Sequence, residues 1–486
     1  MDELLMLWVA SLALLVTATI ARTWRTKKPN NQRAQLPAGS RGWPLVGETL
    51  HFVSSAYSPR PERFMDKRRL MYGKVFRSHL FGSPTIVSTD AEVSRRILQS
   101  DASSFVPWYP KSLTELMGKS SILLINGNLQ RRVHGLIGAF FKSSDLKAQI
   151  TGDMQRYVRK SMAKWKDHQL IHIQDETKNV VFQILVKALI GLEKEKEMAF
   201  LKQQFKEFIA GLMSLPVKLP GSRLYRSLQA SLPIRMGMLI ESIIEEKRKN
   251  NSGCAPRDVV DVLINDASDQ LTDDLISDNM IDLMIPAEDS VPVLVTLAVK
   301  YLSECPLALQ HLQEENTQLK KRRSLVGEDL RWTDYMSLSF TQDVITETLR
   351  MGNIISGIMR KAVKDVEIRG HLIPKGWCVL TYFRSVHLDE NHYGEAYRFD
   401  PWRWKCVLLR HGAPPQDRDM SSSCSFTPFG GGQRLCPGLD LARLEAAIFL
   451  HHLVTNFTWA AEEDQIVNFP TVRLKRGLPI RVRRKS

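Results

Sequence analysis

FTPFGGGQRLCPGLDLAR, residues Phe426–Arg443, places three consecutive glycines, an arginine and one cysteine ahead of an apolar helical pattern. Glycine permits backbone conformations and close approaches that a side chain would block. Backbone amides at the start of a helix favour the thiolate form of Cys436, and Arg434 is placed to meet an anionic group. We therefore expect a large, planar ligand with an anionic edge against this stretch.

The composition is that of a globular protein, with 486 residues, 43% hydrophobic and 24% charged. This length suits two or three domains, or one large unit because repeats and long linkers are missing from the sequence. Its six cysteines form no CxxC pair, which argues against a disulfide framework or a structural zinc site and favours a reducing compartment. The net charge of +15 is spread along the chain without a nucleic-acid-binding motif. It therefore favours an anionic lipid or an acidic protein partner over nucleic acid.

The N-terminus carries an uncharged segment, Leu4–Ala21, which spans about 27 Å as a helix, close to the core of a thin bilayer. A cleaved signal peptide is the alternative, but its first residues should be basic, whereas Asp2 and Glu3 stand here. The basic residues follow the apolar run, as Arg22, Arg25, Lys27 and Lys28. The positive-inside rule then predicts that residues 1–28 are a single-pass signal anchor with the rest of the chain in the cytosol.

Residues 29–50 contain prolines and glycines that cannot continue a helix, so we expect a stiff connector. Its apolar residues Trp43, Leu45 and Val46 should pack against the body of the protein. Residues 51–486 form the expected catalytic domain, with helical periodicity from about residue 92 to 350. Strand patterns predict one hairpin within Tyr72–Asp90 and two more near the C-terminus, within 366–387 and 467–484. The predicted fold is mainly α with small β-sheets.

The segment Thr272–Leu302 is apolar on most sides, as a helix through the centre of a protein must be. Its middle nevertheless holds Pro286 and Pro292, each of which removes a helical hydrogen bond. Two separate helices that meet at this break are one interpretation. The other is a distorted turn within one central helix, which presents Asp289 and Ser290 to a cavity.

The cysteine stretch fits the pattern F-x-x-G-x-R-x-C-x-G without a gap, through Phe429, Gly432, Arg434, Cys436 and Gly438. It resembles the haem-ligand loop of the cytochrome P-450 monooxygenases, and an isolated buried cysteine is a poor alternative to a ten-position match. The resemblance implies the fold of that family, haem b held by these five residues, and Cys436 as the axial ligand of the iron. A thiolate ligand favours O–O cleavage.

Two further matches follow the order of the family. Glu347 and Arg350 form an E-x-x-R motif, which is weak alone but resembles the family's Glu-Arg-Arg cluster once Arg403 is added. That cluster implies a structural role in locking the segment that leads to the cysteine. The sequence PAEDS, 286–290, stands at the oxygen-activation motif, A-G-x-D/E-T in the family. Asp289 and Ser290 keep an acid and a hydroxyl there, so they are the expected catalytic proton donors.

The sequence also departs from the family pattern. Pro286 and Ala287 replace the usual alanine and glycine of the oxygen-activation motif. Where the family often has W-x-x-x-R in the helix beside a haem propionate, Gln130 and His134 stand at those spacings. We expect Gln130 and His134, with Arg131 or Arg132, to take over these cofactor contacts, although any of them could instead be solvated. A Pro-Pro and Ser-rich insertion, 405–425, predicts a surface loop.

Four stretches resemble the plant brassinosteroid-biosynthetic branch of the family, and most nearly its steroid 23-hydroxylases: Leu36–Phe52, Phe64–Phe76, Phe105–Gly135 and Met284–Lys300. This implies C-23 hydroxylation of 6-deoxocathasterone, its 3-epimer or a 22-hydroxylated 3-oxo steroid. The expected pocket segments are 105–124, 208–219, 353–359 and 468–472, although periodicity alone favours ordinary core packing as the reason for their apolar character.

The resemblance also implies dioxygen and NADPH-derived electrons as co-substrates, an NADPH–cytochrome reductase as partner, and the endoplasmic reticulum membrane as location. Three alternatives remain open. The chain could oxidise a sterol of the same pathway at C-22, C-3 or C-6. It could be a haem-thiolate isomerase or dehydratase that needs no dioxygen, which Asp289 and Ser290 argue against. It could bind haem or sterol without turnover, which the intact cysteine loop argues against.

Overall fold

The computed structural model describes residues 34–44, 46–58, 60–118, 120–212, 220–222, 225–227, 232–250, 255–266, 271–405, 425–469 and 471–485. The predicted anchor at 1–28 and nearly all of the 405–425 insertion lie outside these ranges, as do parts of the connector and of the 208–219 segment. Across the described ranges, no single helix combines the length and apolarity that a membrane span requires; only the stretches 273–304 and 306–325, bent by 116°, meet that test together.

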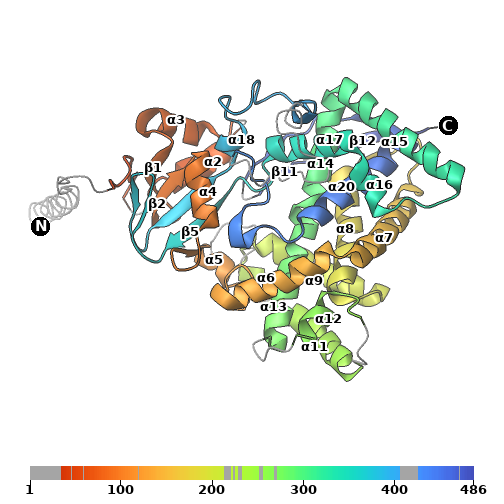
Figure 1. Cartoon of the computed structure of the whole chain (residues 1–486), viewed down its shortest axis with the longest axis horizontal. Coiled ribbons are helices and arrows are strands. Elements are labelled where there is room, and N and C mark those ends of the chain that lie inside the picture. Colours follow the sequence, from red (N-terminus) through yellow and green to blue (C-terminus); the bar gives the residue numbers. More distant parts are fainter. Residues whose placement is uncertain are drawn as a thin grey trace, which may run out of the picture.

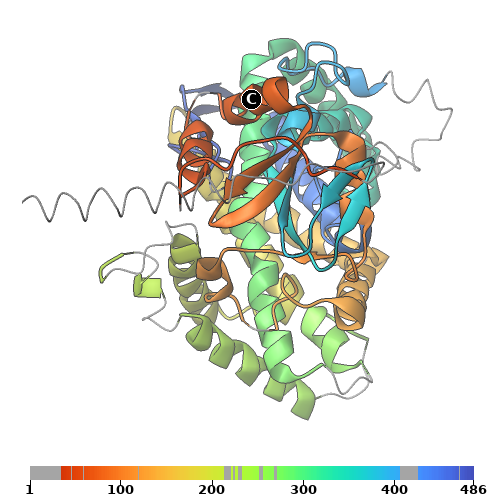
Figure 2. The ribbon, with the colours of Figure 1, turned by 90° about the vertical axis from the view of Figure 1, so that its left-hand side faces the viewer.

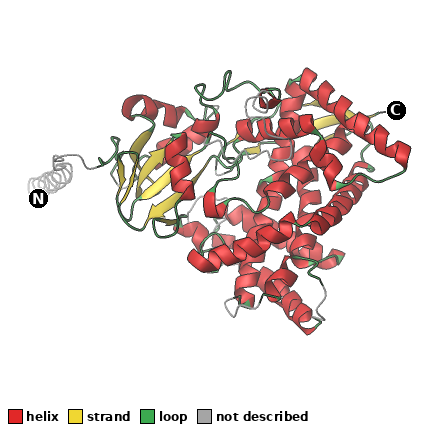
Figure 3. Ribbon diagram, viewed as in Figure 1, coloured by secondary structure: helices red, strands yellow, loops and turns green. Residues whose placement is uncertain are grey.

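The fold is mainly helical with small sheets, as predicted, and the largest sheet lies at one side of the helical body (Figures 1 and 3). The helices are α2 (Thr49–Ala56), α3 (Arg63–Tyr72), α4 (Ala91–Gln99), α5 (Lys111–Thr114), α6 (Gly127–Lys142), α7 (Ser144–Met162), α8 (Ile173–Ile190), α9 (Glu195–Leu212), α11 (Leu232–Lys249), α12 (Val259–Ile264), α13 (Asp273–Asp289), α14 (Val291–Glu304), α15 (Pro306–Val326), α16 (Trp332–Ser337), α17 (Ser339–Gly352), α18 (Arg384–His387) and α20 (Leu439–Asn456), with the 3-10 turn η2 (Gly432–Arg434).

The strands form one large sheet and three small ones. They are β1 (Val75–Leu80), β2 (Ser83–Ser88), β3 (Phe105–Pro107), β4 (Leu170–His172), β5 (Gly357–Ala362), β6 (Val366–Ile368), β7 (His371–Ile373), β8 (Cys378–Tyr382), β9 (Phe457–Ala461), β10 (Ile466–Val467), β11 (Arg473–Leu474) and β12 (Pro479–Arg484). The large sheet has the order β1-β2-β8-β5-β3, in which only β2 and β8 are parallel.

The first predicted hairpin is confirmed by the antiparallel pair β1 and β2. In the second region β6 and β7 form a hairpin, while β8 leaves it and joins the large sheet. In the third region only the short pair β10 and β11 is a hairpin. Strand β12 pairs instead with β4 and β9, where its inward residues Ile480 and Val482 are buried. Burial of one face of the strand has therefore decided its partners.

The expected packing of the connector against the body is wrong for the two residues that can be assessed. Trp43 is 81% exposed and Val46 is 44% exposed. The turn closes on itself, because the amides of Trp43 and Gly47 each donate to the other residue's carbonyl, at 3.1 and 2.8 Å. This closed turn satisfies its own backbone and leaves both apolar side chains in solvent.

Helices α13 and α14 run as one rod through the helical body, interrupted only at Ser290 (Figure 2). The Ser290 amide donates to the Pro286 carbonyl at 3.0 Å, and the Leu294 amide donates to the Ser290 carbonyl at 2.9 Å. Both bonds end at Ser290, which is the C-cap of α13 and the N-cap of α14, so two helices meet at this residue and stay in line. The structure combines the two interpretations, because two helices meet at the break while Asp289 and Ser290 stand at the distorted turn between them.

Glu347, Arg350 and Arg403 come together in the core between α17 and the segment that precedes the cysteine loop. The Glu347 and Arg350 side chains are both 0% exposed and form a two-pronged ion pair, at 2.8 and 2.9 Å. Arg403 Nε and Trp404 Nε1 also donate to the Glu347 carboxylate, each at 3.0 Å. All donors converge on one buried carboxylate, so the charge that burial would otherwise penalise is compensated.

His387 carries this arrangement to the start of the cysteine loop. Arg350 Nη1 donates to the His387 carbonyl at 2.8 Å. The imidazole Nε2 accepts the Thr427 amide at 3.0 Å, so Nδ1 carries the proton and donates to Asn353 Oδ1 at 2.7 Å. Burial, reinforced by the nearby Arg350 cation, lowers the pKa of His387 to about 3 and keeps the ring neutral.

We predict that His387→Gln lowers the free energy of unfolding by about 2 kcal/mol at pH 7.5, because two buried hydrogen bonds are lost. The folded-state pKa lies below the unfolded value, so this stabilisation is complete above about pH 6.5 and is lost as the pH falls toward 3. The wild-type and variant proteins should therefore converge in acid. Urea unfolding at pH 7.5 and 5.5 measures this, with the exposed His392→Gln as control; a pH-independent difference contradicts it.

Candidate functional site

The cysteine loop is held in a compact backbone arrangement before α20 begins. The Cys436 amide donates to the Phe429 carbonyl at 3.1 Å, and the Leu435 amide donates to the Gly432 carbonyl at 3.1 Å. Between them the chain makes the single 3-10 turn η2, which contains Arg434. The backbone of the loop therefore fixes where Cys436 and Arg434 stand before any ligand contact is considered.

Gly432 is required by a close approach to another part of the protein. Its φ is +64°, and a Cβ at this position would lie 2.3 Å from the Leu98 carbonyl oxygen and 2.9 Å from the Gln99 Cα. Both neighbours are at the C-terminal end of α4. The close backbone approach expected of this glycine is therefore an approach to α4, and any larger residue at this position would displace the loop.

Cys436 is a free, half-buried thiol one turn before α20. Burial raises the pKa of the Cys436 thiol, and the Gly438 amide only partly opposes this by a hydrogen bond to the sulfur. The Gly438 amide thus acts in the direction that the sequence predicts, toward the thiolate, while burial acts against it. A coordinated metal cation deprotonates such a thiol, so the sulfur suits the haem iron that the sequence predicts.

Two side chains of α6 hold the cysteine loop from the other side. Gln130 Nε2 donates to the Gln433 carbonyl at 3.3 Å, and His134 Nε2 donates to the Leu435 carbonyl at 2.7 Å. These two carbonyls flank Arg434 in sequence. Arg131 instead donates to Asn128, and Arg132 pairs with Asp266 at 2.7 Å. Gln130 and His134 therefore act on the loop backbone, while Arg131 and Arg132 have other partners.

Arg434 and Arg360 form a pair of neighbouring cations that lacks a carboxylate counterion among the residues the structure describes. Arg434 donates to the Ile122 carbonyl at 3.1 Å, to the Ile125 carbonyl, and to Asn126 Oδ1 at 2.9 Å. Burial first, and then repulsion by Arg360, lowers the pKa of Arg434 to about 10. Burial likewise lowers the pKa of Arg360, and Tyr109 is the only group that opposes it. This arrangement fits an anionic ligand such as the haem propionates.

The distorted turn of the central helix places its acids in two different environments. Glu288 forms an ion pair with Lys178 at 2.8 Å. Asp289 is instead held by the Thr471 hydroxyl, which donates to its Oδ2 at 3.3 Å. Burial raises the pKa of Asp289, which favours a carboxyl that holds a proton. Asp289 and the half-buried Ser290 are therefore adjacent in a turn suited to proton transfer.

Sequence reasoning missed three residues of this site: Tyr109, Arg360 and Thr471. All three lie in or beside segments that were expected to form the pocket. The strand β3 at 105–107 pairs with β5, and the amide of Trp108 donates to the Met359 carbonyl at 3.3 Å. No pattern in the sequence distinguished these three from their neighbours. Strand pairing brings Tyr109 and Arg360 to the site, and the loop before β11 brings Thr471.

The 208–219 segment is described as far as Leu212, and Phe208 shows how its aromatic side chain packs. Phe208 is completely buried and its ring lies 5.8 Å from that of Phe205, which in turn lies 5.7 Å from Phe182. For Phe208 the alternative of ordinary core packing is therefore correct. Residues 213–219 lie outside the described ranges.

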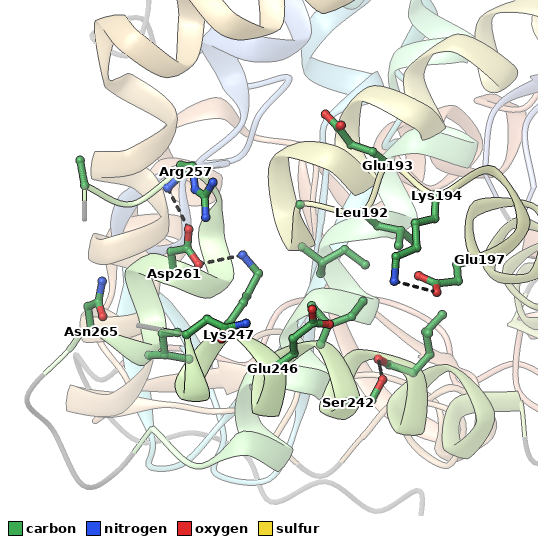
Figure 4. A pocket seen from close by; sticks show the side chains of 17 residues that line it. Leu192, Glu193, Lys194, Glu197, Ser242, Glu246, Lys247, Arg257, Asp261 and Asn265 are labelled. Atoms are coloured by element: carbon green, nitrogen blue, oxygen red, sulfur yellow. Dashed lines mark hydrogen bonds and ion pairs between the residues drawn. The ribbon is translucent and has the colours of Figure 1, made fainter. Parts of the chain in front are cut away.

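A cavity of about 440 Å³ opens between α8, α9, α11 and α12, and Figure 4 shows its lining. Several of its charged groups are paired with one another, as Lys247 with Asp261 at 2.7 Å and Lys194 with Glu197 at 3.2 Å. The lining contains none of the candidate site residues. Across the described residues no cluster of three or more His, Cys, Asp or Glu side chains could hold a bare metal ion. The cysteine loop is therefore the candidate site.

A second hollow, of about 950 Å³, lies directly on the cysteine loop. Phe429 and the three glycines line it, together with Arg95 and Lys147 from other parts of the chain. This hollow is an open surface beside the cysteine loop that a partner protein can contact.

Comparisons with known proteins agree with the geometry. The family model described as "Cytochrome P450" matches residues 37–479. "Cytochrome P450 90D2" from Oryza sativa subsp. japonica is 70% identical over 93% of this chain and 90% of its own length. "3-epi-6-deoxocathasterone 23-monooxygenase CYP90D1" from Arabidopsis thaliana is 60% identical over 93% of this chain and 90% of its own length.

A solved structure titled "Retinoic acid bound cyanobacterial CYP120A1" superposes with a TM-score of 0.78 at 22% identity, over 93% of this chain and all of that one. At this identity the likeness supports the fold alone. The family model and the close relatives go further, because both extend over most of the chain. The chain therefore belongs to the cytochrome P450 family.

Proposed function

We propose that this cytochrome P450 is a steroid C-23 monooxygenase of brassinosteroid biosynthesis. Its substrate is 6-deoxocathasterone, 3-epi-6-deoxocathasterone or a 22-hydroxylated 3-oxo steroid. The observation that carries this proposal is the 60% identity, over 93% of the chain, to a protein named 3-epi-6-deoxocathasterone 23-monooxygenase. A second relative of that name, CYP90C1 from Arabidopsis thaliana, is 52% identical over 93% of the chain and 85% of its own length.

Members of the family use haem iron, which when bound supplies oxygen activation with dioxygen and NADPH-derived electrons. In this proposal Cys436 is the axial ligand, and Phe429, Gly432 and Gly438 shape the loop that presents it. Arg434, with Arg360, meets the propionates. This is supported by the absence of a described carboxylate partner for either arginine.

The remaining contacts on the cofactor side are indirect. Gln130 and His134 belong to the haem site because they hold the two carbonyls on either side of Arg434. Asp289 and Ser290 deliver protons during oxygen activation. The raised pKa of Asp289, whose main cause is burial, supports this role because a protonated carboxyl can donate.

For the rest of the molecule we propose the organisation that the sequence favours. Residues 1–28 anchor the chain in the endoplasmic reticulum membrane, residues 29–50 lead away from it, and residues 51–486 form the catalytic domain in the cytosol. An NADPH–cytochrome reductase docks over the hollow beside the cysteine loop. Arg95 and Lys147, which line the hollow and pair with Glu92 and Asp440, give it basic groups that suit an acidic partner.

The first prediction from the proposed function concerns the axial ligand. The reduced, carbon-monoxide-bound protein should show the red-shifted Soret band of thiolate ligation, and Cys436→Ser should abolish it because an alcohol does not replace a thiolate at the iron. Cys305→Ser, at the start of α15, is the matched control and should keep the band. A Cys436→Ser protein that retains the thiolate band refutes the assignment.

The second prediction concerns proton delivery. Asp289→Asn keeps the hydrogen bond to Thr471 but removes the acid, so product formed per NADPH consumed should fall about 10-fold or more, while steroid affinity changes less than about 3-fold. Glu288→Gln, which alters the neighbouring acid that pairs with Lys178, should leave the yield unchanged. Product yield and NADPH consumption are measured in the same reaction with reductase. A large loss of affinity at constant yield would make Asp289 a substrate-binding residue.

The third prediction concerns the substrate. Burial of the steroid skeleton is worth about 25 cal/mol per Å² whichever end faces the cysteine loop, so polar contacts must set the orientation. An unpaired buried polar group costs about 1–3 kcal/mol, so a 22-hydroxylated steroid should be turned over about 10-fold better than its 22-deoxy analogue. Mass spectrometry of the products tests this. Equal turnover, or oxygen inserted only into the rings, contradicts the proposal.

A further inference from the structure

Asp282 of α13 is a buried acid that the proposed chemistry does not use. Its relative exposure is 6%, and its Oδ2 oxygen has no hydrogen-bond partner among the residues that the structure describes. An unsatisfied buried polar atom costs about 1–3 kcal/mol, and more when the group is charged. An unsatisfied atom of this kind in a packed interior requires an explanation, and a bound ligand that forms the missing hydrogen bond supplies one.

The surroundings of Asp282 fix its place beside the cysteine loop. The Ser121 hydroxyl and the amides of Ile122 and Leu123 lie against its carboxyl and partly offset the effect of burial on its pKa. The carbonyl of the same Ile122 accepts a hydrogen bond from Arg434 at 3.1 Å. The short loop 121–123 thus lies between Asp282 and Arg434, and Arg434 stands two residues before Cys436.

Helical spacing places Asp282 on the same face as the distorted turn. Pro286 follows it by four residues and Asp289 by seven, so the three lie along one stripe of the helix, over about 10 Å. The neighbouring acid on this stripe, Asp278, is different because its Oδ2 accepts the Ser120 amide at 3.0 Å. Of Asp278 and Asp282, only Asp282 has a buried carboxylate oxygen without a hydrogen-bond partner among the described residues.

The protonation of Asp282 suits an alcohol as its partner. Burial raises its pKa to about 7, so near neutrality a large fraction of the carboxyl groups carries a proton. A protonated carboxyl donates one hydrogen bond and accepts another, and an alcohol can do the same in return. A cation would be a poorer partner, since Arg360 and Arg434 lie on the same side of the site.

We propose that Asp282 binds the 22-hydroxyl of the steroid and so orients its side chain toward the reacting position. This rests on the proposed C-23 hydroxylation. The 22-hydroxyl is favoured over a ring-A oxygen because C-22 is bonded to the carbon to be oxidised, which must lie near the cysteine loop. A ring-A oxygen lies at the far end of a rigid tetracycle. Asp282 is therefore a specificity-determining residue within the helix that carries Asp289.

The test measures the dissociation constants of three steroids from the substrate-induced spectral shift of the haem-loaded, full-length protein. They are a 22-hydroxylated steroid, its 22-deoxy analogue, and a 22-hydroxylated analogue without a ring-A oxygen. The wild-type protein should prefer the first steroid to its 22-deoxy analogue by about 10-fold. Asp282→Leu should reduce this preference to less than about 2-fold, by weakening binding of the 22-hydroxylated steroids alone.

Two further variants keep the result interpretable. Asp282→Asn retains the shape and hydrogen-bonding capacity of the side chain, so part of the preference should remain even if the leucine variant loads haem poorly. Asp278→Asn, one turn earlier on the same stripe, should leave the preference unchanged. The thiolate Soret band of each variant confirms that the protein compared is haem-loaded.

The outcomes separate the two proposals. A wild-type protein that shows no preference for the 22-hydroxyl contradicts the proposed substrate. A wild-type preference that survives in both Asp282 variants overturns the role of Asp282 and leaves the proposed function standing. A loss that affects all three steroids equally, or only the preference for the ring-A oxygen, also overturns it.

Discussion

The buried ion pair between Glu347 and Arg350 is the interaction on which the site depends. Neither charge can be left alone in the core, so each must be fully engaged. Arg350 uses its remaining donors on the carbonyls of His387 and Ala396, and Glu347 also accepts from Arg403 and Trp404. The pair therefore fixes the chain that leads into the 405–425 insertion. Through the neutral ring of His387 it also fixes the Thr427 amide, nine residues before Cys436.

The central helix shows a second constraint, because it carries acids where a buried helix would ordinarily be apolar. Glu288 is neutralised by Lys178, whereas Asp282 and Asp289 have their pKa values raised by burial. Burial thus shifts both acids toward their neutral forms, which can donate hydrogen bonds. At Ser290, between the two prolines, α13 ends and α14 begins, and the two helices stay in line. A proton donor and a binding group can thus share one rigid element.

The sequence was sufficient for those parts of the site that lie in one continuous run or at helical spacing. The cysteine loop, the E-x-x-R pair and the acid–hydroxyl turn were all recognisable in this way. Tyr109, Arg360 and Thr471 were not, because each reaches the site only through strand pairing or a loop from elsewhere in the chain. The neighbour of Gly432 was hidden for the same reason, since α4 lies more than 300 residues earlier. The exposure of Trp43 followed from a closed turn that hydrophobicity alone does not predict.

The departures from the family pattern at Gln130 and His134 are explained if positioning the cysteine loop and supplying positive charge are tasks of different residues. Gln130 and His134 donate hydrogen bonds to the backbone carbonyls on either side of Arg434. They therefore position the Arg434 guanidinium, and neither side chain needs a positive charge to do so. The cationic role then falls to Arg434 and Arg360, which repel each other and are both desolvated. Two such cations are stable side by side only if an anion lies between or against them. Haem carries two propionates, and its binding would therefore relieve a repulsion that the protein alone leaves uncompensated.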